Sequence, residues 1–172
     1  MIELRKKRAT LVRALMVVGL VVSSLPAAAQ MAKVEGYDGY LFGMTVDQAM
    51  RVKAGVKYAP CDFKDVVGCI EYDAMVSAFP TRVVVQFKGA SPRLAQVVLQ
   101  FDSLREPIQH PCKVVTAELV RLLVARYGGE PLIVQGVATW TSPEGGSVSF
   151  SQLCIDEKRG FNSVLYRPSA AL

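Results

Sequence analysis

The chain has 172 residues, of which 51% are hydrophobic, and it carries 20 basic and 15 acidic side chains. This length is enough to bury one hydrophobic core of ordinary size. The net charge of +5 would by itself suggest an anionic partner such as a nucleic acid, but its distribution along the chain removes that support.

Residues 1–29 have the organisation of a secretory signal peptide. Five basic residues precede an uncharged run from Ala14 to Val22, which is too short to cross a hydrocarbon layer of ~30 Å as a helix. Pro26 then breaks the helix before three small residues ending at Ala29. We predict cleavage between Ala29 and Gln30, and an uncleaved N-terminal anchor is the alternative. The absence of a cysteine after the apolar run argues against a lipoprotein signal.

Removal of this segment changes the charge of the protein. Residues 1–29 contain five of the 20 basic side chains and one of the 15 acidic ones, Glu3, so residues 30–172 carry 15 basic and 14 acidic side chains. A nearly neutral mature chain does not have the basic surface from which nucleic-acid binding draws its affinity. We therefore expect a periplasmic or secreted protein with no nucleic-acid partner and no membrane anchor after cleavage.

The four cysteines, Cys61, Cys69, Cys112 and Cys154, all lie in the predicted mature chain. An even number in an oxidising compartment predicts two disulfides. Three connectivities are possible, and we favour Cys61–Cys69 and Cys112–Cys154. The first closes a short loop in which Gly68 could supply the bend, and the second ties the start of a predicted helix to a late strand. No cysteines have the spacing of a zinc site, so we predict no metal and no cofactor.

We expect residues 30–39 to form a flexible lead-in, residues 40–168 a single domain and residues 169–172 a tail. Within "FGMTVDQAM", Thr45 and Gln48 have the spacing of a capping box, in which each side chain bonds to the backbone of the other residue. This pattern predicts a helix of about two turns. Its narrow apolar stripe is Val46, Ala49 and Met50, and Gly55 is expected at its C-terminal cap.

The period of the apolar residues then changes from helical to two. In "EYDAMVSAF" one face carries Tyr72, Ala74 and Val76. The same alternation recurs in "RVVVQFK" and "AQVVLQFD", which are joined by the turn "GASPR". The expected dry face carries Val83, Val85, Phe87, Val97, Leu99 and Phe101, and the expected wet face includes Arg82, Gln86, Lys88, Gln96, Gln100 and Asp102. One wet and one dry face predict an antiparallel sheet.

A second helix is predicted in "HPCKVVTAELVRLLVARYGGEP", where Gly128 and Gly129 end the helix. Its expected apolar stripe contains Val115, Leu119, Leu122 and the stem of Arg126, widened by Leu123 and Tyr127. Three strands follow, "LIVQGVATWT", "SVSFSQLCI" and "FNSVLYRP". We expect the sheet interior to take Val134, Ala138, Trp140, Val148, Phe150 and Cys154. The order predicts an α+β fold with two helices on one face of a mainly antiparallel sheet, arranged as two units that each consist of a helix and a meander.

The stretch around Gly43, Met44, Thr45 and Gln48 resembles the start of the small barrel-assembly lipoproteins of the SmpA/OmlA type, and "RYGGEP" is similar to the helix ending of that family. The β-lactamase-inhibitory proteins resemble that plan in tandem. The resemblance implies a helix leading into an antiparallel sheet. It covers about a fifth of the chain, Ala49 stands where the family usually has valine, and no lipid-acceptor cysteine is present. Membrane anchoring and a barrel-assembly role are therefore not expected here.

Candidate catalytic groups are few. His110 is the only histidine, and a catalytic triad would have to use it as its base. A Cys–His pair with Cys112 would need a reduced thiol. Glu71 and Asp73 lie two residues apart on one face of a strand and are the candidate pair for acid–base chemistry at a glycosidic bond. The favoured interpretation is that they form the solvated face of the strand, opposite Tyr72 and Ala74. The lone tryptophan, Trp140, is expected as a core anchor.

These observations favour a non-catalytic exported protein that binds another envelope or secreted protein through a sheet face or through the Cys61–Cys69 loop. The alternatives are an inhibitor of a periplasmic or extracellular hydrolase, whose disulfide-constrained loop lowers the ordering cost of binding, and a small secreted hydrolase that uses Glu71 and Asp73 or His110.

Overall fold

The computed structural model describes residues 32–102, 110–157 and 159–169. The predicted signal peptide, its cleavage site at Ala29 and Gln30, and the last three residues of the predicted tail lie outside these ranges. Within the described ranges, no helix is long and apolar enough to span a membrane.

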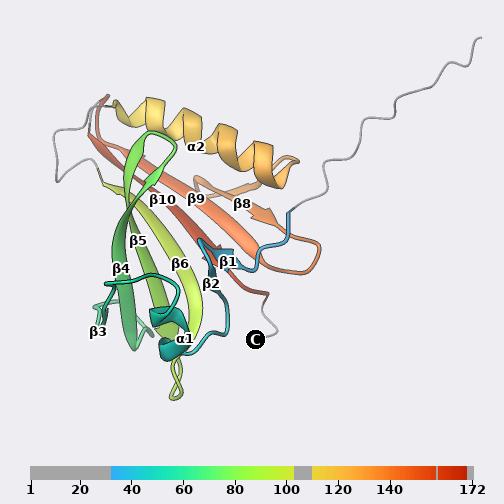
Figure 1. The fold of residues 1–172 in the computed structure, drawn as a ribbon. Coiled ribbons are helices and arrows are strands. Elements are labelled where there is room, and N and C mark those ends of the chain that lie inside the picture. The colour runs from blue at the N-terminus through green and yellow to red at the C-terminus, as the bar shows by residue number, and fades with distance from the viewer. Residues whose placement is uncertain (1–31, 103–109, 158, 170–172) are drawn as a thin grey trace, which may run out of the picture.

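The described residues form two helices and ten strands (Figure 1). The fold class agrees with the prediction, but several helix and strand boundaries differ from it. The helices are α1 (Val46–Met50) and α2 (Cys112–Tyr127). The strands are β1 (Gly36–Tyr37), β2 (Tyr40–Leu41), β3 (Tyr58–Ala59), β4 (Gly68–Val76), β5 (Phe79–Lys88), β6 (Arg93–Asp102), β7 (Leu132–Val134), β8 (Val137–Thr141), β9 (Ser147–Cys154) and β10 (Gly160–Arg167).

Eight strands form one antiparallel sheet in the order β3-β4-β5-β6-β10-β9-β8-β7. The sheet consists of two meanders, β3 to β6 after α1 and β7 to β10 after α2. The last strand of each meander pairs with the other at the centre, where Leu99 of β6 lies opposite Val164 of β10. The predicted plan of two helix-and-meander units is thus present, and the two units meet along the β6–β10 seam.

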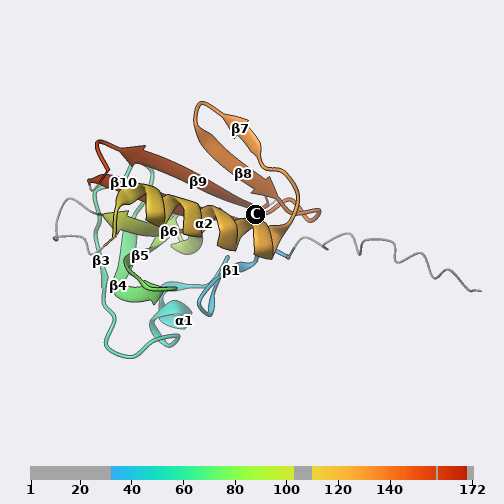
Figure 2. The same ribbon diagram turned by 90° about the horizontal axis from the view of Figure 1, so that it is seen from above.

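Both helices and the β1–β2 hairpin lie on the same face of the sheet (Figure 2). α2 packs on β9 and β10, while α1 and β1 pack near β6. The core contains the expected dry-face residues of β5 and β6 together with the predicted anchors Trp140, Val148 and Phe150. This single core, with helices on one face, confirms the predicted α+β class.

The capping box at the start of α1 is present as predicted. The Thr45 amide donates to Oε1 of Gln48 at 2.9 Å, and the Gln48 amide donates to Oγ1 of Thr45 at 3.2 Å. The helix is shorter than predicted, because it ends at Arg51 and does not reach Gly55. With only Ala49 fully buried, the apolar stripe covers too little of the sheet to stabilise a second turn.

α2 begins at Cys112 and ends before Gly128 (φ 64°), as the glycine pair predicts. Its buried stripe consists of Cys112, Val115, Leu119, Leu123 and Tyr127. Leu122 and Arg126, which were expected at the centre of this stripe, lie along its margin instead, because Leu122 is half-buried and Arg126 is exposed. That margin borders a groove described below.

The stretch "LIVQGVATWT", predicted as one strand, is a hairpin. Gln135 (φ 50°) and Gly136 (φ 78°) form a two-residue turn between β7 and β8, the turn type that matches the twist of paired strands. Val134, expected in the interior, is 56% exposed as a result. β7 is the edge strand of the sheet, so its side chains have no neighbouring strand to cover them on one side.

Two further details differ from the alternating pattern. Gln86, expected on the wet face of β5, is buried, because Cys69 and Gln96 are its cross-strand neighbours and the Gln96 amide bonds to its side-chain oxygen. In the predicted lead-in, residues 32–39 contribute to the fold, since Val34 is buried and β1 pairs with β2. The described part of that segment is therefore integrated with the domain.

Candidate functional site

The two disulfides form with the favoured connectivity. Cys61 is bonded to Cys69 and Cys112 to Cys154, with Cα–Cα distances of 5.7 and 5.8 Å. The second bond joins the first residue of α2 to the last residue of β9, as predicted. Two structural disulfides are typical of a protein that resides in an oxidising environment outside the cytoplasm.

The first disulfide closes a loop at one edge of the sheet, which we call the disulfide loop (residues 61–69). A turn inside it is held by the Val66 amide, which donates to the Phe63 carbonyl at 3.1 Å, and Asp65 adopts φ 61° there. The Val67 amide donates to the carbonyl of Phe87 in β5 at 2.9 Å. The loop is therefore fastened to the sheet both covalently and by a backbone bond.

Gly68 does not supply the bend that the sequence suggested. It is the first residue of β4, and a Cβ atom added there would lie 2.3 Å from the ring of Tyr58. The Tyr58 ring packs edge-on against Phe87, with ring centroids 5.5 Å apart. The glycine is needed because this aromatic ring crosses the backbone closely, while the bend of the loop falls at Asp65.

The tip of the disulfide loop presents an apolar surface with charges around it. Phe63 is 40% exposed and Val67 is 46% exposed. Asp62, Lys64 and Asp65 beside them are also exposed. A loop constrained in this way loses less conformational entropy when it binds another protein than a flexible loop does.

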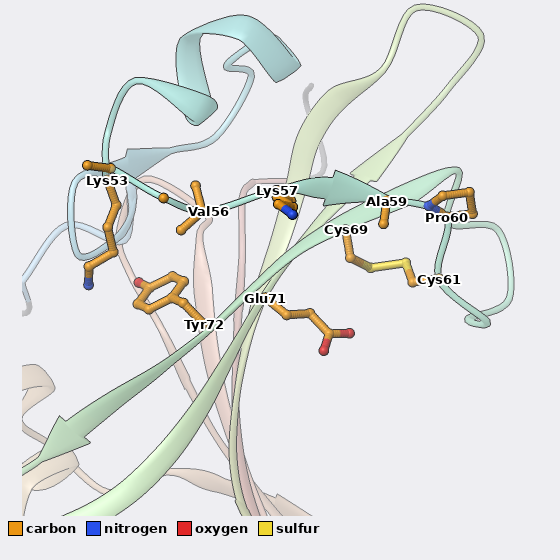
Figure 3. A pocket seen from close by; sticks show the side chains of 11 residues that line it. Lys53, Val56, Lys57, Ala59, Pro60, Cys61, Cys69, Glu71 and Tyr72 are labelled. Atoms are coloured by element: carbon orange, nitrogen blue, oxygen red, sulfur yellow. A yellow bond between two sulfur atoms is a disulfide. The ribbon is translucent and has the colours of Figure 1, made fainter.

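A groove of about 660 Å³ lies beside the disulfide loop, and we call it the edge groove (Figure 3). One wall is the chain from Lys53 to Cys61, and the other is β4, with Cys69, Glu71 and Tyr72. The short strand β3 pairs with only two residues of β4, Cys69 and Ile70. From Glu71 onward, β4 has no further strand on that side among the described residues.

This arrangement leaves an open backbone edge next to the groove. In an antiparallel strand alternate residues direct their N–H and C=O groups to each side, so part of the β4 backbone between Glu71 and Val76 faces away from β5. No backbone hydrogen bond to another described segment covers those groups. Such an edge accepts an additional strand.

At the end of the groove near Lys53, the side chains of Asp38, Lys53 and Tyr72 form a polar cluster. The Tyr72 hydroxyl donates to Oδ2 of Asp38 at 2.9 Å, and Nζ of Lys53 donates to the same oxygen at 3.3 Å. Nζ of Lys53 also lies 4.0 Å from the centre of the Tyr72 ring. Burial, followed by the hydrogen bond to Asp38, raises the pKa of Tyr72 well above its ordinary value. Tyr72 is therefore a neutral hydrogen-bond donor under physiological conditions.

The candidate catalytic residues occupy separate places. Glu71 and Asp73 are exposed on the outer face of β4, and Oε2 of Glu71 lies 3.4 Å from Nε of Arg82. His110 precedes α2, where its ring packs edge-on against Phe79 at 5.1 Å between centroids. Trp140 is buried as predicted, although its indole N–H has no described partner.

Sequence reasoning did not identify Asp38, Lys53 and Tyr58 as parts of this region. Asp38 lies in the β1–β2 turn, within a segment expected to be flexible, and only the packing of that hairpin brings it to Tyr72. A weak signal was available in "GYDGY", where an aspartate between glycines is typical of a turn. Among the described residues, no group of three or more His, Cys, Asp and Glu residues could hold a metal ion.

Comparison of the chain with protein-family models, with curated proteins and with solved structures gave no significant match.

Proposed function

We propose that the protein is an exported, non-catalytic binding module of the cell envelope, and that it holds an extended segment of another periplasmic or secreted protein in the edge groove. The observation that carries the proposal is the open edge of β4 beside a disulfide-fastened loop. An extended segment would continue the sheet where β3 ends, since backbone hydrogen bonds supply affinity and alternating side chains supply specificity in this mode of binding.

The charges of the edge suggest the chemistry of the partner segment. Glu71 and Asp73 project from the outer face of β4, and Lys53 and Lys57 lie on the opposite wall of the groove. Of these, Glu71 is paired with Arg82 and Lys53 with Asp38. A segment with a basic residue opposite Asp73 and an acidic residue opposite Lys57 would complement the open part of β4 and the facing wall of the groove.

Site-specific photo-crosslinking in the cells that produce the protein tests this proposal. A photoreactive residue is placed at Asp73 on the open edge, at Phe63 on the disulfide loop, or at Glu130, an exposed control position after α2. We expect the first two positions to capture the same envelope protein and the control to capture none. Equal capture at all three positions, or no capture at Asp73 and Phe63, would contradict the proposal.

A charge reversal provides an independent measurement. In a pull-down from the cell envelope, Asp73→Arg should lower recovery of the partner about tenfold, since like charges across an interface are costly. The matched control, Glu130→Arg, makes the same change in net charge away from the groove and should leave recovery unchanged. Equal losses in both variants would indicate an effect of net charge rather than of the edge.

The second candidate function is inhibition of a periplasmic or extracellular hydrolase by the disulfide loop. The exposed Phe63 on a covalently closed loop favours it, because a rigid apolar residue is the kind of anchor that fills a partner's pocket. In this case the captured partner is a hydrolase, and its activity falls when the purified protein is added. Phe63→Ala should abolish that inhibition while leaving the fold intact.

Three substitutions distinguish a secreted hydrolase from the binding module and from the hydrolase inhibitor. His110→Ala, Glu71→Gln and Asp73→Asn remove the histidine and the two carboxylates that the sequence offers as candidate catalytic groups. Under the binding proposal, the purified protein shows no hydrolytic activity that these variants abolish. Loss of a measured activity in a folded His110→Ala variant would overturn the non-catalytic assignment.

A further inference from the structure

A second groove lies over the seam between the two helix-and-meander units, and we call it the seam groove. Its volume is about 550 Å³, within the range of ~300–1,000 Å³ that is usual for small-molecule sites. It is formed between α2, which packs on β9 and β10, and β1, which contacts both β6 and β10. Its lining comes from α2, from Tyr37 of β1, from the seam strands β6 and β10, and from Val76 and Ser77 at the β4–β5 turn.

The floor and the side walls of the seam groove are apolar. Leu99 of β6 and Val164 of β10 come from the sheet, and Leu119 and Leu123 come from α2. All four are buried, with at most 6% of their surface exposed. Leu122 and Val76 continue the apolar lining at the rim, where both side chains are half-buried. A surface of this composition favours a hydrocarbon chain over a polar ligand.

One end of the groove is cationic. Arg126 lines it and is exposed, and no carboxylate of the described residues forms an ion pair with its guanidinium. Its described contact is with the ring of Tyr127, 5.7 Å from the ring centre. Tyr37 and Tyr166 line the same groove, with ring centroids 5.2 Å apart. This end therefore combines a positive charge with polar hydroxyl groups.

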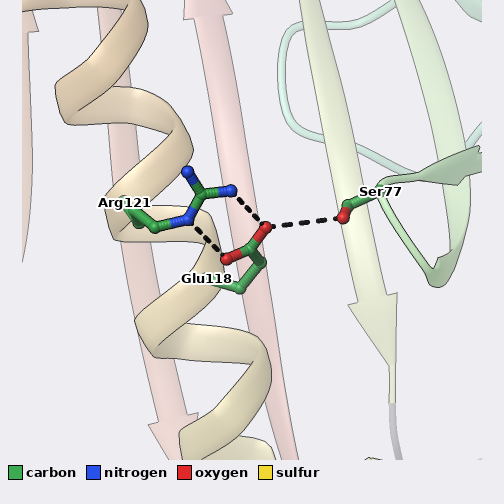
Figure 4. Close-up of polar contacts among 3 residues, drawn as sticks. All are labelled: Ser77, Glu118 and Arg121. Carbon is green, nitrogen blue, oxygen red and sulfur yellow. Dashed lines mark hydrogen bonds and ion pairs between the residues drawn. The ribbon is translucent and has the colours of Figure 1, made fainter.

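Toward the start of α2, a polar contact links the helix to Ser77, which lines the groove (Figure 4). Arg121 donates from Nε and from its terminal nitrogen to the two carboxylate oxygens of Glu118, each at 2.7 Å. The Ser77 hydroxyl, in the turn between β4 and β5, donates to Oε1 of Glu118 at 3.4 Å. Glu118 and Arg126 are eight residues apart, or about 12 Å along a helix. The Glu118–Arg121 ion pair and Ser77 therefore lie toward one end of the groove, and Arg126, which has no ion-pair partner among the described residues, lies toward the other.

We propose that the seam groove binds a fatty acid of the size of laurate, with its carboxylate on Arg126 and its acyl chain along the leucine-lined floor. The charge of Arg126 selects the anionic head, and the apolar lining selects the single chain. This site shares no lining residue with the edge groove. It therefore goes beyond the proposed function and can be tested separately from it.

Calorimetric titration of the full exported, oxidised protein with laurate, below its micelle concentration, tests the site. We expect one laurate per chain, and tighter binding than that of octanoate by about two- to fourfold for each methylene that enters the groove. Methyl laurate, which has the same chain without the charge, should bind about tenfold more weakly than laurate. Absence of laurate binding would overturn the proposal, as would equal affinity for laurate and its methyl ester.

Three variants locate the ligand. Arg126→Gln should weaken laurate about tenfold and leave methyl laurate unchanged, whereas Lys113→Gln, the same loss of charge on another exposed residue of α2, should change neither affinity. Leu122→Asp should weaken both ligands, because it places a charge beside the acyl chain. Circular dichroism establishes that each variant is folded. Unchanged laurate affinity in folded Arg126→Gln and Leu122→Asp would refute this location.

Discussion

Tyr40 and Tyr72 stack in the core with ring centroids 5.7 Å apart, but only one of the two hydroxyl groups has a described partner. The Tyr72 hydroxyl donates to Asp38 at 2.9 Å. The Tyr40 side chain is completely buried, and its hydroxyl has no hydrogen-bond partner among the described residues. Two chemically identical groups therefore differ in what they contribute to the free energy of unfolding.

Tyr40→Phe and Tyr72→Phe should consequently shift stability in opposite directions. Removing the unsatisfied hydroxyl of Tyr40 should raise the free energy of unfolding by about 1 kcal/mol, while removing the hydroxyl of Tyr72 should lower it by about 1 kcal/mol. Urea unfolding of the two variants measures both effects, and each serves as the control for the other. A Tyr40→Phe variant that is less stable than the wild type would show that its hydroxyl is satisfied in solution.

The tyrosines also predict how stability depends on pH. Burial is the main cause that raises the pKa of Tyr37, Tyr40, Tyr72, Tyr127 and Tyr166. The unfolded chain releases these protons near the ordinary tyrosine pKa of about 10. Their contribution to the free energy of unfolding is therefore complete below about pH 10 and is lost as the pH rises toward the folded-state values.

Two measurements check this pH dependence. Absorbance titration of the folded protein near the phenolate band should show most tyrosines ionising only when the chain unfolds. Urea unfolding should give a free energy that declines above about pH 10. If all the tyrosines of the folded protein ionised at the ordinary tyrosine pKa of about 10, the burial of these rings would be contradicted.

The two disulfides should differ in their effect on stability. They link residues separated by 42 positions in Cys112–Cys154 and by eight in Cys61–Cys69. In the chain-entropy model, the longer closed loop stabilises by about 4 kcal/mol and the shorter by about 2.5 kcal/mol. Urea unfolding of Cys112→Ala/Cys154→Ala and of Cys61→Ala/Cys69→Ala compares them.

The same pair of variants separates stability from binding. We expect the Cys61→Ala/Cys69→Ala variant to lose partner recovery more than the other variant does, although it is the more stable of the two, since only its loop borders the edge groove. A larger loss of binding in the Cys112→Ala/Cys154→Ala variant would argue against a role for the disulfide loop.

Gly160 should not tolerate a side chain. A Cβ atom there would lie 2.2 Å from Sγ of Cys112 and 2.7 Å from the carbonyl oxygen of Leu153. Gly160→Ala should therefore lower the free energy of unfolding by about 1–3 kcal/mol, the usual cost of overpacking. In the Cys112→Ala/Cys154→Ala background the cost should be smaller, because the sulfur is gone. Equal costs in both backgrounds would assign the strain to the backbone of Leu153 and Cys154, whose carbonyl oxygen and Cα atom would lie 2.7 and 2.9 Å from the added Cβ atom.

Local patterns in the chain were sufficient to predict the fold class, the start of α1, the extent of α2 and the disulfide pairing. Most of these depend on residues that are close in sequence: the Thr45–Gln48 capping box is a short-range contact, and the glycine pair directly follows α2. The two disulfides follow from an even number of cysteines in a chain predicted to reach an oxidising compartment. The alternating strands also indicated an antiparallel sheet, because a period of two places one face toward the core.

Other features were decided by the tertiary structure. The end of α1 and the burial of Gln86 depend on what packs against them, and the Asp38–Tyr72 bond joins residues 34 positions apart. Local propensity carries no information about such contacts. The two grooves also depend on the tertiary structure. One lies where β3 pairs with only two residues of β4, and the other lies where α2 and β1 meet over the β6–β10 seam. Sequence patterns located both helices and the longer strands, because their periodicity is local. The short strands β1 to β3, the open edge of β4 and the two grooves followed from how the elements pack and how far each extends over the sheet.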